Sequence, residues 1–241
     1  MSSLTTTKSK KAKAKAKKEA RRVEKQAELG RRATVRAAMF SDVASETPRD
    51  ALQDSGFGAD SPFTNFAMDN MDVKVCFATA SDLSTEDLQR LFDLMKTNMH
   101  AHYCRAAEVC PSEWAWSDRK KMAELKEPEA RYLVAREASP SSGSQGPIIA
   151  FAHFRFELEG LYTVLYVYEL QIAESAQKHG LGRHFMQLLE LIGVKQGMQW
   201  VMLTVFKGND GAGSFYERLK YELDEIDPSL SEESAMDAPA P

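Results

Sequence analysis

The sequence predicts an α/β (α+β) fold in which helices flank a mixed central sheet and a basic N-terminal arm precedes them. Two long β-rich runs follow one another, and helices and strands alternate after them, which is typical of a mixed sheet. The charge distribution sets the arm apart, because residues 1–40 hold 13 Lys/Arg and 3 Asp/Glu whereas the remainder holds 18 and 32. We therefore expect a basic arm, either helical or disordered, on an acidic body.

The composition excludes several classes of protein. A hydrophobic content of 43% over 241 residues suffices for a buried core, so disorder of the whole chain is excluded. No stretch reaches the roughly 18 consecutive apolar residues of a membrane span, and we expect a soluble intracellular protein with no membrane partner. Cys76, Cys104 and Cys110 lack metal-ligand spacing, so we expect reduced thiols and no metal.

The chain divides into four predicted regions: a basic arm over 1–40, a linker over 41–71, a folded domain over 72–229 and an acidic, disordered tail over 230–241. The arm contains good helix formers but almost no apolar face. Clustered Lys/Arg of this kind can serve nuclear import, can contact nucleic acid or the ribosome, or can merely keep the chain soluble. The sequence leaves these alternatives open.

The first part of the domain reads as strand, helix, helix and strand. Val73, Val75 and Phe77 alternate as in a strand, and Ser84 with Asp87 three residues later predicts the start of a helix. The apolar residues of that helix have the spacing of core positions: Leu88, Leu91, Phe92, Met95 and Met99. A short polar helix over 117–125, a strand over 132–136 and a flexible Ser/Gly-rich connection over 139–147 follow.

The second part begins with a hairpin. The β-rich runs Ile148–Glu157 and Tyr162–Ile172 are joined through Gly160, a residue typical of tight turns. After the hairpin we expect a helix over 181–195, a strand over 200–206 and a helix from about 210 to 220.

The turn before the helix at 181–195 is a candidate anion site. A strand that leads through Gly180 and Gly182 into a helix leaves backbone N–H groups free at the positive end of the helix dipole. Glycine lets a phosphate approach the backbone closely. A dinucleotide fingerprint needs a third glycine where Phe185 stands, and the Gly-Lys-Ser/Thr of a P-loop is absent.

The remaining pattern over 177–183 resembles the acyl-CoA loop of the GNAT acetyltransferase superfamily. In that superfamily the loop follows a hairpinned fourth strand and precedes a helix, a strand and a second helix bearing Asn-x-x-Ala-x-x-Phe-Tyr. Asn209, Ala212, Phe215 and Tyr216 occupy those four positions here. The resemblance implies the GNAT fold, with acetyl-CoA as co-substrate.

Longer stretches resemble the N-terminal acetyltransferase D (NatD) family of that superfamily. They cover most of 85–229 and comprise 91–99, 113–116, 151–156, 166–171 and 201–207. The resemblance implies acetylation of the α-amine of core-histone tails beginning Ser-Gly-Arg-Gly, those of histones four and two-A, by direct transfer in a ternary complex.

Acetyl transfer to an ammonium group needs a general base that removes a proton. Glu169 lies among apolar neighbours in the strand before the CoA loop, where desolvation raises a carboxyl pKa, and the family places an essential Glu at the matching position. Tyr166 and Tyr168 share a strand face by the period of two and are candidates to orient the amine or bridge a water to Glu169. Tyr216 matches a position where superfamily members keep a phenol near the CoA sulfur.

The resemblance also implies binding residues. The cofactor set, in which the first three pair with pantetheine through their backbones, is Leu170, Gln171, Ile172, Gln177, Lys178, His179, Gly180, Leu181, Gly182, Arg183 and Asn209. The substrate set is Tyr103, Trp114, Glu157, Leu158, Glu159, Tyr168 and Thr204. Glu157 and Glu159 share a face of their strand, and paired carboxylates suit an arginine side chain of a peptide.

Two alternative functions stay open. One is a GNAT enzyme that acetylates lysine, a ribosomal protein or another protein N-terminus. The other is a chromatin- or RNA-binding module in which the arm does the binding. We expect histone tails as partners, ribosome or nucleic acid as partners of the arm, a monomer, and a location in nucleus and cytoplasm.

Overall fold

The computed structural model describes residues 6–42, 46–58, 61–68, 71–138 and 146–224, and it divides the chain into a unit of residues 1–204 and a unit of residues 205–241. The second unit contains α7 (Asp210–Arg218). The elements of the first unit, in order, are α1 (Thr6–Met39), β1 (Phe40–Asp42), β2 (Thr47–Pro48), α2 (Ala51–Asp54), β3 (Asn65–Met68), β4 (Met71–Thr79), α3 (Thr85–Val109), α4 (Pro111–Trp114), α5 (Asp118–Glu124), β5 (Arg131–Glu137), β6 (Ile148–Glu159), β7 (Tyr162–Ile172), the 3-10 turn η1 (Glu174–Ala176), α6 (Leu181–Lys195) and β8 (Trp200–Leu203).

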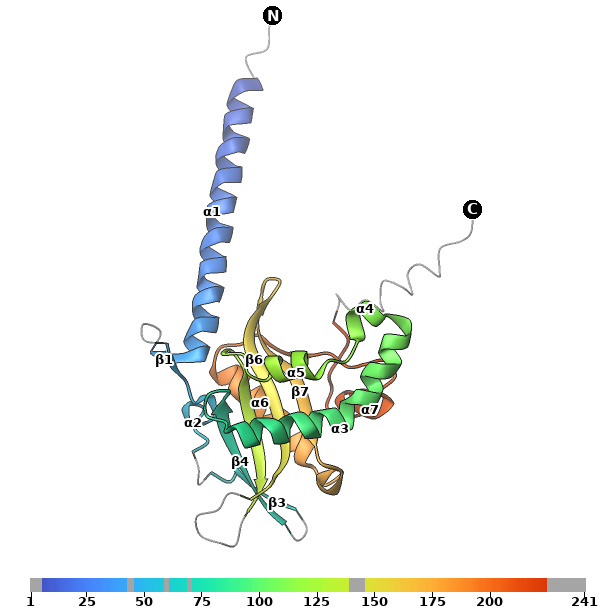
Figure 1. The fold of residues 1–241 in the computed structure, drawn as a ribbon. Helices are drawn as coiled ribbons and strands as arrows, with labels where there is room; N and C mark the ends of the chain where they lie inside the picture. Colours follow the sequence, from blue (N-terminus) through green and yellow to red (C-terminus); the bar gives the residue numbers. More distant parts are fainter. Residues whose placement is uncertain (1–5, 43–45, 59–60, 69–70, 139–145, 225–241) are drawn as a thin grey trace, which may run out of the picture. The chain divides into compact units, whose positions relative to one another are not determined.

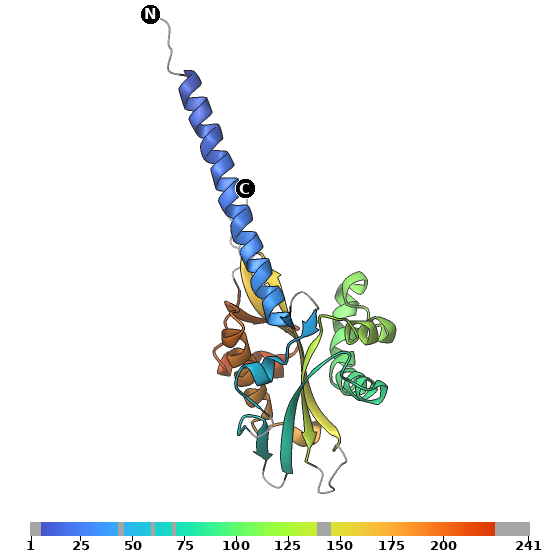
Figure 2. The same ribbon diagram turned by 90° about the vertical axis from the view of Figure 1, so that its left-hand side faces the viewer.

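The mixed sheet that the sequence predicts is confirmed. Its strands lie in the order β3-β4-β5-β6-β7-β8; neighbours are antiparallel except β7 and β8, which are parallel because α6 connects them. Helices α3 to α5 cover one face, and α2 and α6 cover the other (Figures 1 and 2). Within the described residues, no helix is long and apolar enough to span a membrane.

Sequence periodicity located the core correctly. Ser84 caps α3, since its side chain accepts a hydrogen bond from the Asp87 N–H at 3.0 Å. The helix buries four of the five predicted apolar residues, and Met99 is partly buried beside them. They pack on the sheet against Tyr132, Val134 and Phe151. This side-chain layer fixes α3 on β5 and β6, and α3 also contacts β7, where the candidate site lies.

Several boundaries differ from the expectation. Strand β8 ends at Leu203 and α7 ends at Arg218, both short of the predicted ends. Described residues of the predicted linker 41–71 form β1, β2, α2 and β3, because Leu52 and Ala51 bury apolar surface that a solvated linker would expose. The predicted connection 139–147 lies mostly outside the described residues, and the tail 230–241 lies wholly outside them.

A β-bulge interrupts β7 at Tyr168. Across the hairpin, Arg155 pairs with Tyr166 and His153 pairs with Glu169, which leaves Tyr168 as an extra, unpaired residue. Directly paired residues lie on the same face, and Arg155 and His153 share a face because they are two residues apart. Tyr166 and Glu169 therefore face the same side although they are three positions apart in the sequence.

The arm is helical, one of the two predicted alternatives. Helix α1 spans 34 residues, and its last turns pack on β6 and β7. Ala38 is buried there, and the buried Arg131 guanidinium donates to the Met39 carbonyl at 3.4 Å. A cation at a helix C-terminus binds carbonyls that have no partner within the helix. The end of α1 thus packs as part of the folded domain. The domain therefore starts before residue 40, where the sequence predicts the end of the arm.

Candidate functional site

A buried carboxylate, Glu169, lies in β7 below α3 and α5. Its side chain is 9% exposed, and its Oε2 accepts a hydrogen bond from Gln171 Nε2 at 2.7 Å. Burial raises the pKa of Glu169, whereas the Lys121 charge and the Gln171 hydrogen bond oppose that rise. A carboxylate with a raised pKa and one amide donor is suited to act as a general base.

Helices α3 and α5 place a tyrosine and a lysine near this carboxylate. Lys121 Nζ lies 2.8 Å from Glu124 Oε2 and 4.7 Å from the ring centroid of Tyr103. Burial opposes protonation of Lys121, but the hydrogen bonds with Glu124 and Tyr103 raise its pKa. Burial raises the pKa of the Tyr103 phenol, so this hydroxyl stays protonated. The site thus has a fixed cation beside its carboxylate.

A stack of rings leads from the core to the surface on the same face. His153 lies between Tyr132 and Tyr168, with ring centroids 5.1 and 5.2 Å away. Burial, followed by the charges of Arg155 and Lys121, lowers the pKa of His153 to about 3. The imidazole is therefore neutral, and its Nε2 accepts from Arg155 Nε at 3.4 Å. The Arg155 guanidinium lies 4.5 Å from the centroid of the Tyr168 ring.

The outer end of this stack carries the predicted substrate residues. Tyr168 is 42% exposed and donates its hydroxyl to Glu157 Oε1 at 2.9 Å. Its ring lies 5.0 Å from that of Tyr166, and the Tyr166 hydroxyl bonds to that of Thr204. The two tyrosines therefore share a face of β7, as the sequence predicts. Glu159 lies two residues beyond Glu157 on β6 and keeps to the same face.

The helical side of the site carries aromatic residues. Tyr103 lies near two tryptophans, with ring centroids 6.4 Å from Trp114 and 5.2 Å from Trp116. The structure therefore brings together two residues of the predicted substrate set, Tyr103 and Trp114. Leu158 lies on the opposite face of β6 from Glu157 and Glu159, because side chains alternate along a strand.

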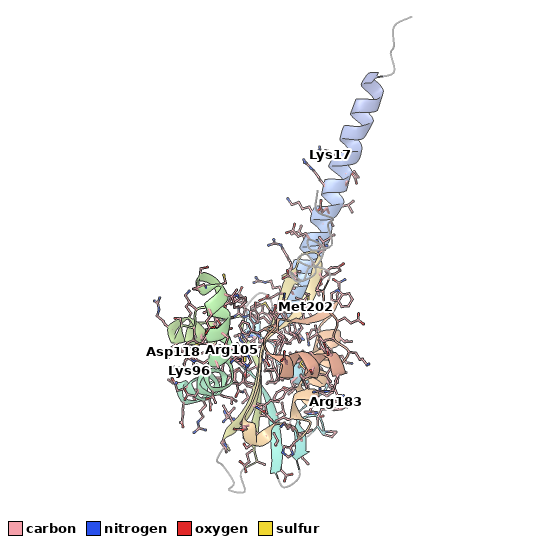
Figure 3. The ribbon with its side chains drawn as sticks, turned by 90° about the vertical axis from the view of Figure 1, so that its right-hand side faces the viewer. Lys17, Lys96, Arg105, Asp118, Arg183 and Met202 are labelled. Carbon is pink, nitrogen blue, oxygen red and sulfur yellow. The ribbon has the colours of Figure 1, made fainter. Side chains whose placement is uncertain are left out.

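The glycine turn before α6 has the backbone of an anion site. Gly180 adopts φ +86° and Lys178 adopts φ +67°, and the first helical hydrogen bond runs from His184 N to the Gly180 carbonyl at 3.0 Å. The N–H groups of residues 181 to 183 precede that bond, so they have no carbonyl partner within the helix. The first turn has no acidic residue, and Arg183 extends from it (Figure 3). These groups fit a pyrophosphate.

Next to the turn, β7 has a free backbone edge. The last pair between β7 and β8 joins Val167 to Leu203, so the residues of β7 after the bulge have no partner in β8. An extended chain can pair with such an edge as an added strand. One backbone group near the end of this edge already has partners: the Ile172 carbonyl accepts from Asn98 Nδ2 at 3.1 Å and from Gln177 Nε2 at 3.0 Å. The side chain of Gln177 thus forms a hydrogen bond that stabilises the end of β7.

Two predicted residues lie in the second unit. Asn209 caps α7, where its Oδ1 accepts from the Ala212 N–H at 3.2 Å. The Tyr216 ring lies 4.9 Å from that of Phe215 and 5.8 Å from that of Tyr221. Both residues therefore have local structural contacts within their own unit.

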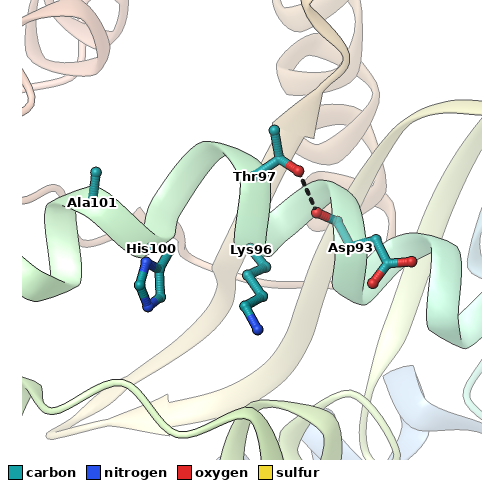
Figure 4. A pocket seen from close by; sticks show the side chains of 5 residues that line it. All are labelled: Asp93, Lys96, Thr97, His100 and Ala101. Carbon is teal, nitrogen blue, oxygen red and sulfur yellow. Dashed lines mark hydrogen bonds between the residues drawn. The ribbon is translucent and has the colours of Figure 1, made fainter.

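A separate open hollow runs along the outer side of α3. It is lined by Asp93, Lys96, Thr97, His100 and Ala101 (Figure 4). Lys96 already forms an ion pair with Asp118 at 2.7 Å, and Thr97 bonds to the backbone carbonyl of Asp93. The hollow contains neither the carboxylate nor the glycine turn, so it is not the candidate site.

Sequence reasoning missed four residues of the site: Asn98, Lys121, His153 and Arg155. A signal was present for two of them. Asn98 follows Leu91 by seven residues and therefore falls on the apolar face of α3, and His153 interrupts an apolar strand. A polar residue at a core position needs a hydrogen-bond partner, so such a position indicates a buried polar contact.

A sequence profile of the acetyltransferase (GNAT) family matches residues 88–221, more than half of the chain. This chain belongs to the GNAT acetyltransferase family. The match includes the buried carboxylate, the free strand edge, the glycine turn and α7. As a GNAT acetyltransferase, the protein uses acetyl-CoA as its acyl donor, and the turn and the strand edge fit the pyrophosphate and the pantetheine arm. No group of three or more metal-ligating side chains occurs within the described residues.

Solved structures that this chain resembles include other acetyltransferases. A ribosomal-protein-alanine N-acetyltransferase from Brucella melitensis is 14% identical, with 64% of this chain and 96% of that chain covered and a TM-score of 0.44. An aminoglycoside acetyltransferase from an uncultured soil sample is 16% identical, with coverage of 64% and 91% and a TM-score of 0.45. A Bacillus halodurans protein is 17% identical, with coverage of 64% and 96% and a TM-score of 0.46.

Proposed function

We propose that this GNAT acetyltransferase acetylates the α-amine of protein N-termini that begin Ser-Gly-Arg-Gly, those of histones four and two-A, by direct transfer in a ternary complex. The observation that carries the proposal is a buried carboxylate, Glu169, beside the free edge of β7, with the acidic Glu157 at the outer end of the same face. The long sequence stretches that resemble the NatD family support the same substrate.

In this mechanism Glu169 takes the proton of the substrate ammonium, directly or through one water, because only the neutral amine is a nucleophile. The amine attacks the thioester carbonyl of acetyl-CoA, and the C–N bond forms as the C–S bond breaks. The departing CoA thiolate is balanced by the second proton that the attacking nitrogen loses. Tyr166 and Tyr168 line the path to Glu169 and orient the amine. Burial below α3 and α5 keeps bulk water from Glu169, which favours proton transfer from the amine.

The rim explains the choice of a basic peptide. Glu157 holds the Tyr168 hydroxyl, and Glu159 lies beside it without an ion pair among the described side chains. An arginine at the third position of the substrate can bridge two carboxylates with its planar group of donors. A small residue at the second position lets the tail pass the ring of Tyr168.

A peptide panel tests the substrate. We expect acetylation of a peptide beginning Ser-Gly-Arg-Gly at least tenfold faster in kcat/KM than of one beginning Ser-Ala-Ala-Ala, and none of an N-terminally blocked peptide that keeps its lysines. Replacing Glu157 and Glu159 together by Gln should remove the preference, because an ion pair of this kind contributes about 1–3 kcal/mol. Mass spectrometry locates the acetyl group. Acetylation of the blocked peptide alone would overturn the α-amine assignment, and equal rates on the two free peptides would overturn the histone substrate.

A stripe of cations on α1 supports a second interaction. Lys18, Arg22, Lys25, Arg32 and Arg36 recur at three, four or seven residues, so they follow one side of the helix, and all are exposed. This basic stripe is anchored through the end of α1 while the body of the protein is acidic. We propose that it binds the phosphate backbone of duplex DNA and brings the enzyme to histone tails, in the nucleus as well as the cytoplasm.

Two truncations test the arm. A protein that lacks residues 1–30 should keep its peptide acetylation and thermal stability but lose most DNA affinity in fluorescence anisotropy. A protein that lacks residues 1–40 should also lose stability, by about 1–3 kcal/mol, because Arg131 then lacks the Met39 carbonyl. The DNA affinity of the full chain should fall steeply with salt. Undiminished DNA binding after the shorter truncation, or tighter binding to an RNA hairpin, would contradict the proposal.

A further inference from the structure

Three side-chain amide and carboxyl groups form a chain of hydrogen bonds under α3. Asn98 Nδ2 donates to Gln171 Oε1 at 3.0 Å and to the Ile172 carbonyl at 3.1 Å. Gln171 Nε2 in turn donates to Glu169 Oε2 at 2.7 Å. Gln171 is 4% exposed, so this chain is shielded from water.

The direction of these bonds is determined at Asn98. Its single amide nitrogen faces two acceptors, the Gln171 oxygen and the Ile172 carbonyl, and uses both of its hydrogens. A reversed amide would put the Asn98 oxygen against the Ile172 carbonyl, a backbone group that only accepts hydrogen bonds. With the Gln171 oxygen held by Asn98, the Gln171 nitrogen must point at Glu169.

We propose that Asn98 is a positioning residue for the general base, because it orients the Gln171 amide so that a donor, and never an acceptor, faces Glu169. This inference rests on the proposed role of Glu169 as the base. A donor stabilises the ionised carboxylate, which is the form that accepts a proton, whereas an acceptor stabilises the protonated form. Asn98 thereby opposes the effect of burial on Glu169.

The same residue also connects the base to the cofactor edge. The Ile172 carbonyl accepts from both Asn98 and Gln177, and Gln177 begins the glycine turn. The end of β7 is thus held from α3 on one side and from the turn on the other. Asn98 fixes the spacing between the proton acceptor and the strand edge that pairs with pantetheine.

The test is a pH profile of kcat/KM for the Asn98→Asp variant, with whichever free peptide of the panel the wild type acetylates. The new carboxylate only accepts hydrogen bonds, so the Gln171 amide rotates and presents its oxygen to Glu169. We expect the acid limb of the profile to move up by about one pH unit, a tenfold loss on that limb, with the alkaline plateau within twofold of the wild type. The other charged or titratable groups near Glu169 stay in place: Lys121, Glu124, Tyr103, Tyr132 and His153.

Two further variants make the result decisive. Thr97→Val, the neighbouring position on the outer side of α3, is the matched control and should leave the profile unchanged. Asn98→Leu removes the donor without adding charge, and it should move the limb in the same direction by less. Thermal unfolding and CoA binding report whether each variant is folded, and the Leu variant carries the test if the Asp variant does not fold.

The outcomes separate this inference from the proposed function. A uniform loss at all pH values, or an unchanged profile, in a folded Asn98 variant would overturn the role of Asn98 and leave Glu169 as the base. Wild-type turnover of Glu169→Gln would overturn the base itself. When Asn98→Asp is added to Glu169→Gln, we expect no further loss, because the group through which Asn98 acts is already gone. An additional loss of tenfold or more would contradict the inference.

Discussion

Glu169→Gln should lower kcat by about 10²- to 10⁴-fold, the usual contribution of a general base, and leave the affinity for CoA within about twofold. The amide occupies nearly the same volume and keeps a neighbour for Gln171, so the fold is retained. It cannot accept the proton of the ammonium group. Single-turnover acetylation and calorimetric CoA binding measure the two effects separately.

Glu174→Gln is the matched control, because Glu174 is an exposed carboxylate just after the end of β7. We expect wild-type turnover for this variant. The wild-type rate should fall as the pH drops through the raised pKa of Glu169, since protonation removes the base, and that acid limb should vanish in Glu169→Gln. If Glu169→Gln turns over like the wild type, another group is the base.

Gly180→Val should weaken acetyl-CoA binding by at least tenfold. At φ +86° a β-branched residue is strained by about 1–3 kcal/mol, and relief of that strain displaces the N–H groups at the start of α6. The added methyl groups also keep phosphate away from the turn. The KM for acetyl-CoA should rise while kcat at saturation changes little, which steady-state kinetics can resolve.

Gly160→Val separates strain from ligand binding. Gly160 also has a positive φ, +55°, and a Cβ there would meet nothing within 4 Å. It lies at the tip of the β6/β7 hairpin, away from the glycine turn. We expect this variant to lose similar stability but to keep its KM for acetyl-CoA. Equal increases of KM in both variants would show that the Gly180 effect is general strain.

The local sequence was sufficient to predict the elements whose ends are marked by capping or turn residues. Helix α6 begins and ends where the sequence predicts, because Gly180 precedes an amphipathic run that extends unbroken to Lys195. The capped start of α3 and the hairpin turn at Gly160 were equally local. The glycine turn is predicted for the same reason, whereas Glu169 is a candidate because of its apolar neighbours together with the resemblance to the family.

The rest of the site depends on pairing between distant segments. Asn98 reaches Gln171 across 73 positions of sequence, and the charge near Glu169 comes from Lys121 on a helix whose sequence looks merely polar. A regular strand would also have put Tyr166 and Glu169 on opposite faces. The bulge that changes this depends on register with β6, which no local pattern predicts.

That bulge gives β7 one residue more than its partner strand needs. Deleting Tyr168 would restore an uninterrupted ladder in which Val167 still pairs with Phe154 and Glu169 still pairs with His153, so the carboxylate would keep its face. The loss would fall on the outer end of the site instead, because the residue removed is the exposed ring whose hydroxyl bonds to Glu157. A single in-frame codon loss here would therefore spare the proton acceptor and remove a peptide contact.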